Sequence, residues 1–290
     1  MFGRIVAKYL NIPVVTTYHT MYEDYTHYVN RFEIDEVDKV TKKVVSTFSR
    51  SISDSAQAVI SPSEKTKETL LKYGVKTPIY VIPTGLNFEK FHPDNIDPAR
   101  VQEIRRQYGI QEDERLIVFV GRIAQEKSIE IPIEGFRYVS DTKIKLMIVG
   151  GGPQLEELQK LVQRHHLERQ VIFTDKKLPE EIPAYYACAD CFVSASLTET
   201  QGMTYIEALA CGLPVFARYD DVLKDLVIEE DSGFLFETPQ EFAEKLTDFM
   251  HRSAEERKAF SRRALSKIVK YDRSEEHTSE LQSHTQISYA

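Results

Sequence analysis

Short apolar runs alternate with stretches of helical spacing along most of the chain. The runs read LIVFV, KLMIVG, VIFT, CFVSAS and LPVFA, and they begin at Leu116, Lys145, Val171, Cys191 and Leu213. Short, nearly continuous apolar runs are typical of strands that are buried on both faces. The stretch PQLEELQKLVQRHH between two of them has the spacing of an amphipathic helix. Strands that alternate with helices predict a doubly wound, parallel α/β domain.

The same alternation is incomplete at the start of the chain. It opens with the helical pattern MFGRIVAKYL, followed by the strand IPVVTTYH, a long basic helix over Val37–Ser53, the strand QAVISPS, the helix SEKTKETLLKYG and the strand IYVIPT. An α/β domain of this kind normally opens with a strand and the turn that faces phosphate. We therefore expect this first domain to lack its beginning.

A turn-rich stretch from Pro83 to Pro98, PTGLNFEKFHPDNIDP, separates the two parts. Its Pro and Asn residues favour turns and linkers. The charge balance changes there as well, because residues 1–92 carry 12 basic and 10 acidic side chains and residues 93–272 carry 24 and 32. We predict two domains, 1–92 and 93–272, with the boundary near His92.

The last stretch, RSEEHTSELQSHTQISYA at residues 273–290, has no periodic apolar residues with which to join a core. It resembles the translation of a sequencing-library adapter, so we expect it to be a non-native tail. A chain that lacks the start of its first domain and ends in such a tail need not itself be active.

Composition restricts the class of protein. An apolar content of 42% with 12 Gly and 12 Pro excludes disorder and collagen-like repetition, and no apolar run approaches the roughly 20 residues of a transmembrane helix. Three cysteines cannot form a disulfide framework, and the N-terminus lacks a signal-peptide pattern, so a reducing cytoplasm is expected. The net charge of -8 argues against general nucleic-acid binding.

Several common catalytic signatures are absent from the sequence: G-x-x-x-x-G-K-S/T, G-x-S-x-G and H-E-x-x-H. The glycines Gly150–Gly152 follow a strand, but Leu155 breaks the dinucleotide fingerprint, so a tight turn with Pro at the helix start is favoured. Cys188 and Cys191 have CxxC spacing without a second pair. Two buried small residues are expected there rather than a zinc or redox site.

Two segments of the second domain carry more specific chemistry. Arg122 and Lys127 follow the strand at Leu116, at the edge where open α/β sheets bind ligands, and two cations there suit a diphosphate. In the second segment a strand runs through a Gly turn into a helix, so the backbone amides at Gly202–Thr204, including Met203, predict an anion site.

Glu199 and Glu207 lie before and after this turn. Carboxylates accept paired hydrogen bonds from vicinal hydroxyls, so the two residues suit a ribose and a hexose. Taken singly, each segment is explained equally well by charged side chains on a solvated face.

Together these motifs resemble the retaining glycosyltransferases of the GT-B fold, in particular glycosyltransferase family 4. The matched residues are G-R-x-x-x-E-K at Gly121–Lys127, E-x7-E at Glu199–Glu207, and the A-C-G-L-P run that closes the second segment. The resemblance covers essentially all of residues 1–272. It implies two Rossmann-like domains facing across a cleft, the first of them incomplete.

Carried over by position, the resemblance implies that Arg122 and Lys127 bind the diphosphate of a nucleotide sugar. Glu207 would bind the ribose hydroxyls and Glu199 the donor hexose, with the amides of Gly202, Met203 and Thr204 supporting hexose and phosphate. The same carboxylates would hold glucose, galactose or mannose.

His19, at the end of PVVTTYH, matches the family's histidine that reaches the donor sugar across the cleft; a hydrogen-bonded histidine at a strand end is the alternative. The run HTMYEDYTHY from His19, with ETQGMTY from Glu199, is similar to bacterial diacylglycerol 3-α-glucosyltransferases. These make the monoglucosyl lipid of envelope and lipoteichoic acid anchors. Gln201, where many family members have Phe, fits this lipid subgroup.

This similarity implies transfer of glucose from UDP-glucose to the 3-hydroxyl of diacylglycerol, by a peripheral enzyme at the inner face of the cell membrane. Lys39, Lys42, Lys43 and Arg50 lie among apolar residues of the long helix, and such a helix can lie in an anionic membrane surface. An ordinary domain helix whose apolar stripe faces the core is the alternative.

The resemblance also implies front-face attack, in which the leaving diphosphate helps to deprotonate the acceptor. No D-x-D is present, so no metal is implied, and the donor nucleotide sugar is the only small molecule expected besides the acceptor. Three alternatives remain open. They are a family 4 enzyme with a polysaccharide or teichoic acid acceptor, a sugar-nucleotide epimerase or phosphorylase, and a non-catalytic membrane-binding module of the same fold.

Overall fold

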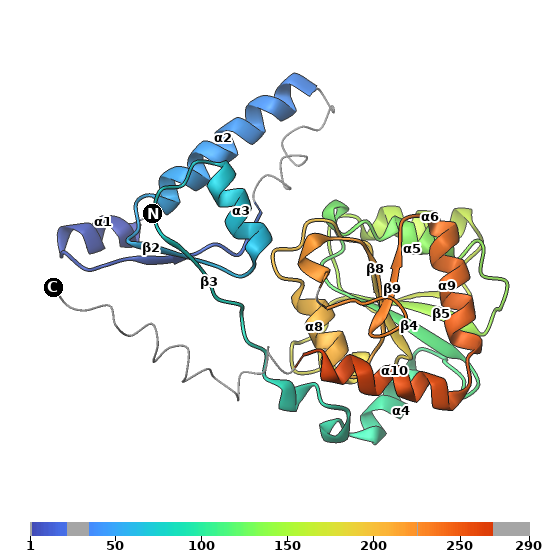
Figure 1. The fold of residues 1–290 in the computed structure, drawn as a ribbon. Helices are drawn as coiled ribbons and strands as arrows, with labels where there is room; N and C mark the ends of the chain where they lie inside the picture. The colour runs from blue at the N-terminus through green and yellow to red at the C-terminus, as the bar shows by residue number, and fades with distance from the viewer. Residues whose placement is uncertain (1, 22–34, 225, 269–290) are drawn as a thin grey trace.

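The computed structural model describes residues 2–21, 35–224 and 226–268, which form two α/β units joined by the stretch 82–97 (Figure 1). In the first unit three strands pair in parallel in the order β1-β2-β3. Its elements are α1 Phe2–Tyr9, β1 Val15–Thr17, α2 Asp35–Ser53, β2 Ala58–Ser61, α3 Glu64–Lys72 and β3 Ile79–Val81. All six correspond to elements that the sequence pattern predicts.

The second unit contains a parallel sheet of six strands in the order β6-β5-β4-β7-β8-β9. Its strands are β4 Arg115–Val120, β5 Ile144–Val149, β6 Val171–Phe173, β7 Cys191–Ser194, β8 Val215–Arg218 and β9 Gly233–Phe236. Its α-helices are α4 Pro98–Gln107, α5 Glu130–Gly135, α6 Leu155–Arg164, α7 Ile182–Ala187, α8 Met203–Ala210, α9 Pro239–His251 and α10 Ala254–Ser266. This strand order is that of the doubly wound, dinucleotide-binding type of sheet, and the predicted α/β fold class is confirmed.

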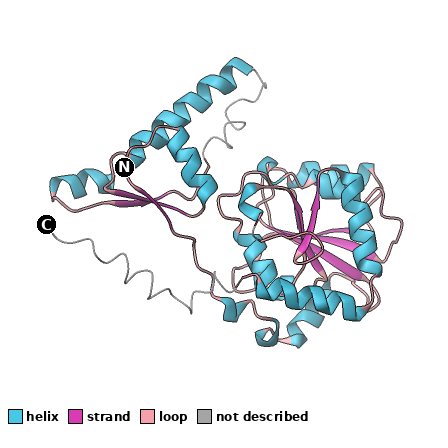
Figure 2. Cartoon of the chain, viewed as in Figure 1, coloured by secondary structure: helices cyan, strands magenta, loops and turns pink. Residues whose placement is uncertain are grey.

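Helices cover both faces of the six-stranded sheet (Figure 2). Successive side chains of a strand point to opposite faces, and β4 shows the consequence. Leu116 and Val118 belong to the apolar core with Tyr186 of α7, whereas Ile117 belongs to the core with Phe242 of α9. Both faces of β4 are therefore buried, which explains why its sequence is a continuous apolar run rather than an alternating one.

Among the described residues, the core of the first unit is much smaller. Its buried apolar cluster consists of Tyr18, Met21, Val59, Leu70 and Val75. Helix α3 is held at its start by the Ser63 hydroxyl, which accepts a hydrogen bond from the Thr66 amide. The three strands place the loops after β1 and β2 on the side of the second unit.

Two parts of the sequence analysis need comment. Strand β9 is a real element that the pattern did not predict. The predicted tail at 273–290 and most of the run HTMYEDYTHY lie outside the described residues. Within the described part of the chain, no helix combines the length and apolar character needed to cross a membrane.

Candidate functional site

The loops after β4 and β7 meet at the point where the strand order of the large sheet reverses. β4 and β7 are neighbours, with Ile117 opposite Cys191 and Val118 opposite Phe192. Connections leave such a pair toward opposite faces of the sheet and open a crevice at the carboxyl ends of the strands. The structure thus brings together the two segments that the sequence analysis selected.

Lys127 and Glu199 form an ion pair in this crevice. The Lys127 ammonium Nζ lies 2.7 Å from Glu199 Oε1, and both side chains are largely buried. The two loops are joined a second time, because the hydroxyls of Ser196 and Thr198 donate to the carbonyl oxygen of Glu126. The predicted cation and the predicted sugar-binding carboxylate therefore lie in direct contact, although 72 residues separate them in the sequence.

Helix α8 begins immediately after the loop that carries Glu199. Gly202 occupies the position before its first residue with φ of +76°, a left-handed conformation that glycine adopts most easily. Its carbonyl oxygen accepts from the amides of Tyr205 and Ile206, whereas the amides of Met203 and Thr204 come too early in the helix for an intrahelical partner. The helix predicted to follow this Gly turn is present; anion binding at its start stays a prediction.

Glu207 lies one turn further along α8 and is partly buried. The hydroxyl of the fully buried Tyr186 donates a hydrogen bond of 2.9 Å to Glu207 Oε2. Burial raises the pKa of Glu207 to about 7, and the Tyr186 hydrogen bond opposes that rise. Burial, with the nearby Glu207 carboxyl, in turn raises the pKa of Tyr186. Tyr186 was not selected by sequence reasoning, since a tyrosine in an apolar helix is usually only a core residue.

Gly121 and Arg122 follow β4 and line a cavity of about 490 Å³ at the carboxyl ends of β4 and β5. The turn Gly150–Pro153 forms another wall, with Lys176 and Lys177 from the loop after β6. Gly150 has φ of +147°, and a Cβ at this position would collide with the carbonyl oxygen of Gly121. The turn is tight, as predicted. The sequence analysis did not predict that this turn lines a cavity; the adjacent Lys176 and Lys177 after the strand at Val171 could have indicated it.

His19 lies two residues beyond β1 and is exposed. Its carbonyl oxygen accepts a hydrogen bond of 3.2 Å from the Thr200 hydroxyl, next to Glu199. The structure therefore brings the predicted histidine to the same loop as the predicted carboxylate, with the recorded contact made by its backbone.

The basic helix α2 presents Val44 and Phe48 to solvent, with exposed fractions of 62% and 49%. Lys43 and Arg50 are also exposed, and Arg50 contacts Asp54 at 3.4 Å. The side chains of Lys39 and Lys42 lie outside the described part of the structure. Where α2 is described, its apolar stripe thus does not lie wholly in the core.

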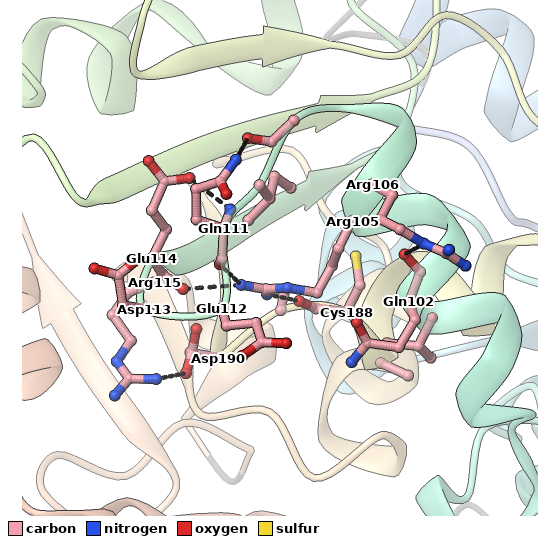
Figure 3. Close-up of a pocket in the computed structure, with 15 residues that line it drawn as sticks. Gln102, Arg105, Arg106, Gln111, Glu112, Asp113, Glu114, Arg115, Cys188 and Asp190 are labelled. Atoms are coloured by element: carbon pink, nitrogen blue, oxygen red, sulfur yellow. Dashed lines mark hydrogen bonds and ion pairs between the residues drawn. The ribbon is translucent and has the colours of Figure 1, made fainter.

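A larger hollow of about 940 Å³ lies at the opposite, amino-terminal edge of β4 (Figure 3). Its most central cation, Arg105, donates to the carbonyl oxygens of Cys188, Gln111 and Glu114. These three hydrogen bonds link the α4 helix to the backbone at one edge of the domain. The geometry of this hollow is that of a structural junction, away from the crevice.

The described residues contain no group of three or more His, Cys, Asp or Glu side chains placed to hold a metal ion. Cys188 and Cys191 are both buried, as the sequence analysis expected. Burial raises the pKa of the Cys188 thiol to about 12, so this thiol is protonated at neutral pH.

Comparison with known proteins gives two family matches. Residues 100–267 match the model for glycosyl transferases group 1, and residues 1–90 match that for glycosyltransferase family 4. Alpha-monoglucosyldiacylglycerol synthase of Streptococcus pneumoniae is 37% identical over 81% of this chain and 53% of its own length. The protein of the same name from Acholeplasma laidlawii is 34% identical over 84% of this chain and 62% of its length. The chain thus spans between half and two thirds of these relatives.

Among solved structures, HepE of Anabaena in complex with UDP and glucose superposes with a TM-score of 0.75 at 19% identity. The match covers 93% of this chain and 70% of that one. At this identity the likeness shows a shared fold with two α/β domains.

Proposed function

The chain belongs to glycosyltransferase family 4, and from that premise we propose that it is a retaining hexosyltransferase that uses a nucleotide sugar. The proposed donor is UDP-glucose and the proposed acceptor is the 3-hydroxyl of diacylglycerol. The observation that carries the proposal is the Lys127–Glu199 pair at the reversal point of the sheet, beside the start of α8.

In the proposed complex the donor extends along the crevice. Arg122 and Lys127 would bind the diphosphate, with the amides of Met203 and Thr204 supporting it. Glu207 would accept hydrogen bonds from the ribose hydroxyls and Glu199 from the hexose. The cavity beside Arg122, of about 490 Å³, would hold the base. It opens at the carboxyl ends of β4 and β5, where sheets of this kind bind nucleotides.

The proposed chemistry needs little covalent participation by the protein. The bond from the sugar C1 to the diphosphate oxygen breaks while C1 bonds to the acceptor oxygen on the same face, and the acceptor proton passes to the departing phosphate. Negative charge grows on the diphosphate, and a well-placed donor that stabilises such charge contributes roughly 3–4 kcal/mol. Arg122, Lys127 and the start of α8 would supply this stabilisation, in the place where other enzymes use a bound metal ion.

His19 has a distinct place in the proposal. Its backbone contact with Thr200 brings the loop after β1 to the sugar-binding end of the crevice. From there the imidazole would reach the hexose from the side opposite to Glu199. This role distinguishes it from a histidine that only ends a strand.

The acceptor assignment follows the names of the two relatives that are 37% and 34% identical to this chain. It is supported by the exposed apolar residues Val44 and Phe48 beside the cation Lys43 on α2. A surface of this composition binds membranes that contain anionic lipid, with each nearby cation contributing about 1 kcal/mol. We therefore propose peripheral attachment at the inner face of the cell membrane.

The proposal is tested by transfer from labelled UDP-glucose to vesicles that contain diacylglycerol and an anionic phospholipid. We expect label in the lipid fraction as an α-glucoside, and a large loss of this product in Lys127→Ala. Lys160→Ala, which removes a lysine from the exposed face of α6, is the matched control. Label that passes only to another acceptor would replace the acceptor assignment, and donor binding without transfer would favour a binding module.

A further inference from the structure

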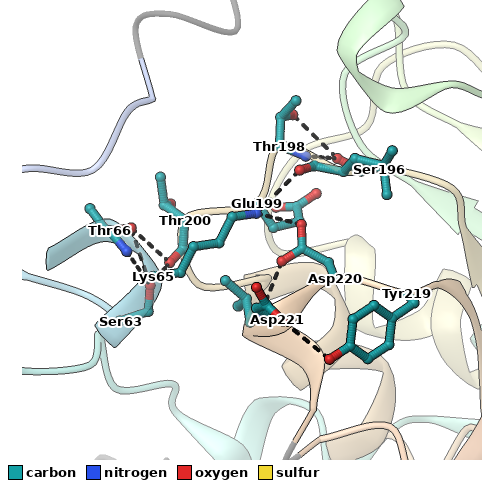
Figure 4. Close-up of polar contacts among 12 residues, drawn as sticks. Ser63, Lys65, Thr66, Ser196, Thr198, Glu199, Thr200, Tyr219, Asp220 and Asp221 are labelled. Atoms are coloured by element: carbon teal, nitrogen blue, oxygen red, sulfur yellow. Dashed lines mark hydrogen bonds and ion pairs between the residues drawn. The ribbon is translucent and has the colours of Figure 1, made fainter. Parts of the chain in front are cut away.

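The loop Leu197–Gln201 lies between the two units and is held by both of them (Figure 4). It carries Glu199, which the proposed function places on the donor hexose. From the second unit, this carboxylate is fixed by Lys127. The contacts from the first unit hold Leu197, two residues before Glu199, and Thr200, directly after it.

Helix α3 supplies most of these contacts. The Ser63 hydroxyl, at the start of the helix, donates to the carbonyl oxygen of Thr200 at 2.5 Å, and the Thr66 hydroxyl donates to the same oxygen at 3.3 Å. On the other side of Glu199, the Lys65 ammonium donates to the carbonyl oxygen of Leu197 at 3.2 Å. Ser63, Lys65 and Thr66 thus hold the carbonyl groups of Leu197, two residues before Glu199, and of Thr200, one residue after it.

Lys65 also pairs with an acid of the second unit. Its Nζ lies 2.5 Å from Asp220 Oδ2, and the Asp220 side chain is only 2% exposed. The other Asp220 oxygen, Oδ1, accepts from the Val222 amide. A buried carboxylate is costly without a compensating cation, so Asp220 fixes the position of Lys65 and thereby the distance between α3 and the loop.

The side chain of Gln201, at the end of the loop, makes two further hydrogen bonds outside the second unit. Its Oε1 accepts from the Thr84 amide at 2.8 Å and its Nε2 donates to the Thr84 carbonyl at 2.9 Å. Thr84 belongs to the stretch that joins the two units. The loop is therefore bonded both to α3 of the first unit and to the stretch that joins the two units.

We propose that Lys65 is a positioning residue for the donor hexose. By bonding both Asp220 and the Leu197 carbonyl, it sets the place of the Glu199 carboxylate from the acceptor side of the molecule. The inference rests on the proposed function, because it takes Glu199 as the ligand of the hexose. The proposal gives α3 a part in donor binding. The sequence does not indicate this part, because α3 lies far along the chain from Arg122 and Lys127.

The proposal predicts an effect that depends on the sugar. UDP would reach Arg122, Lys127 and Glu207 but not the hexose-binding end of the loop. Loss of Lys65 should therefore weaken binding of UDP-glucose and leave binding of UDP nearly unchanged. A variant that only destabilises the fold would weaken both ligands in the same proportion.

The test is calorimetric titration of UDP-glucose and UDP into the 290-residue chain and its Lys65→Met variant. We expect the dissociation constant for UDP-glucose to rise about tenfold, as for the loss of one charge-assisted contact, and that for UDP to change less than about twofold. Lys67→Met is the matched control, because Lys67 lies on the same helix and pairs only with Glu64 at the surface in the recorded contacts. It should bind both ligands like wild type.

The double variant Lys65→Met/Asp220→Asn separates positioning from simple charge compensation. It removes the uncompensated buried acid, so its melting temperature should return close to that of wild type while UDP-glucose binding stays weak. If it regains wild-type UDP-glucose binding as well, Lys65 serves only to neutralise Asp220 and the proposal is overturned. If wild type binds neither ligand, the proposed function fails; if wild type binds both and Lys65→Met matches it, only the role of Lys65 fails.

Discussion

Replacement of Glu207 by Gln should stabilise the fold above neutral pH and at the same time weaken donor binding. The structure raises the pKa of this carboxyl from 4.5 to about 7, chiefly by burial. Because the pKa is higher in the folded state than in the unfolded state, the folded state holds the proton more tightly. The free energy of unfolding contributed by Glu207 therefore falls as the pH rises from about 4.5 through about 7.

The magnitude follows from the shift. A rise of about 2.5 pKa units at about 1.4 kcal/mol each corresponds to about 3 kcal/mol of lost stability once the group is fully ionised. Gln cannot ionise, and its side-chain carbonyl can still accept the hydrogen bond from Tyr186. The Gln variant should thus match wild type near pH 4 and exceed it by up to about 3 kcal/mol near pH 8.

The assay is urea unfolding at a series of pH values, followed by circular dichroism because the chain has no Trp. UDP-glucose binding is measured on the same samples. Wild-type affinity should increase between pH 6 and 8, as Glu207 ionises and becomes able to accept two hydroxyl hydrogen bonds, whereas the variant should bind weakly at every pH. A stability difference that does not change with pH, or a variant that is less stable than wild type near pH 8, would refute this reasoning.

Three further predictions concern other parts of the molecule. Lys127→Ala should lower kcat by about 100-fold or more with a modest effect on KM, and steady-state transfer kinetics within a few-fold of wild type would contradict its role. Gly150→Ala should destabilise the fold by more than about 3 kcal/mol in thermal denaturation, since a Cβ there meets the Gly121 carbonyl, and an unchanged melting temperature would contradict that contact. Phe48→Ser should weaken co-sedimentation with anionic vesicles about tenfold, because it removes an exposed aromatic ring from the proposed membrane surface; equal sedimentation would place that surface elsewhere.

The strands of the large sheet could be predicted because most of them are buried on both faces. β4 has the apolar run LIVFV after Arg115, and β5 has the apolar run LMIV after Lys145; such runs are typical of strands buried on both faces. β9 escaped prediction because it is a short edge strand that starts at Gly233. Its glycine weakens the strand pattern, yet a Cβ there would collide with the Val215 carbonyl of the neighbouring strand. Gly is thus required at position 233 by a contact with a neighbouring strand, which cannot be predicted from the residues around Gly233 alone.

The candidate site could be predicted as two segments but not as a set of contacts. The resemblance to family 4 selects Lys127, Glu199 and Glu207 from their spacing, and sheet topology explains why the first two meet. The partnership of Glu207 with Tyr186 depends on the packing of α7 against α8. The Lys65–Asp220 pair joins residues 155 positions apart on different units, and no local pattern marks either residue.

The place where a donor binds tests the central claim most directly. A crystal structure of the chain with UDP-glucose should show the diphosphate at Arg122 and Lys127, the ribose at Glu207 and the hexose at Glu199. Lys127 would then leave Glu199, at least in part, for a phosphate oxygen. A donor bound in the larger hollow around Arg105, or anywhere away from the reversal point of the sheet, would contradict the account.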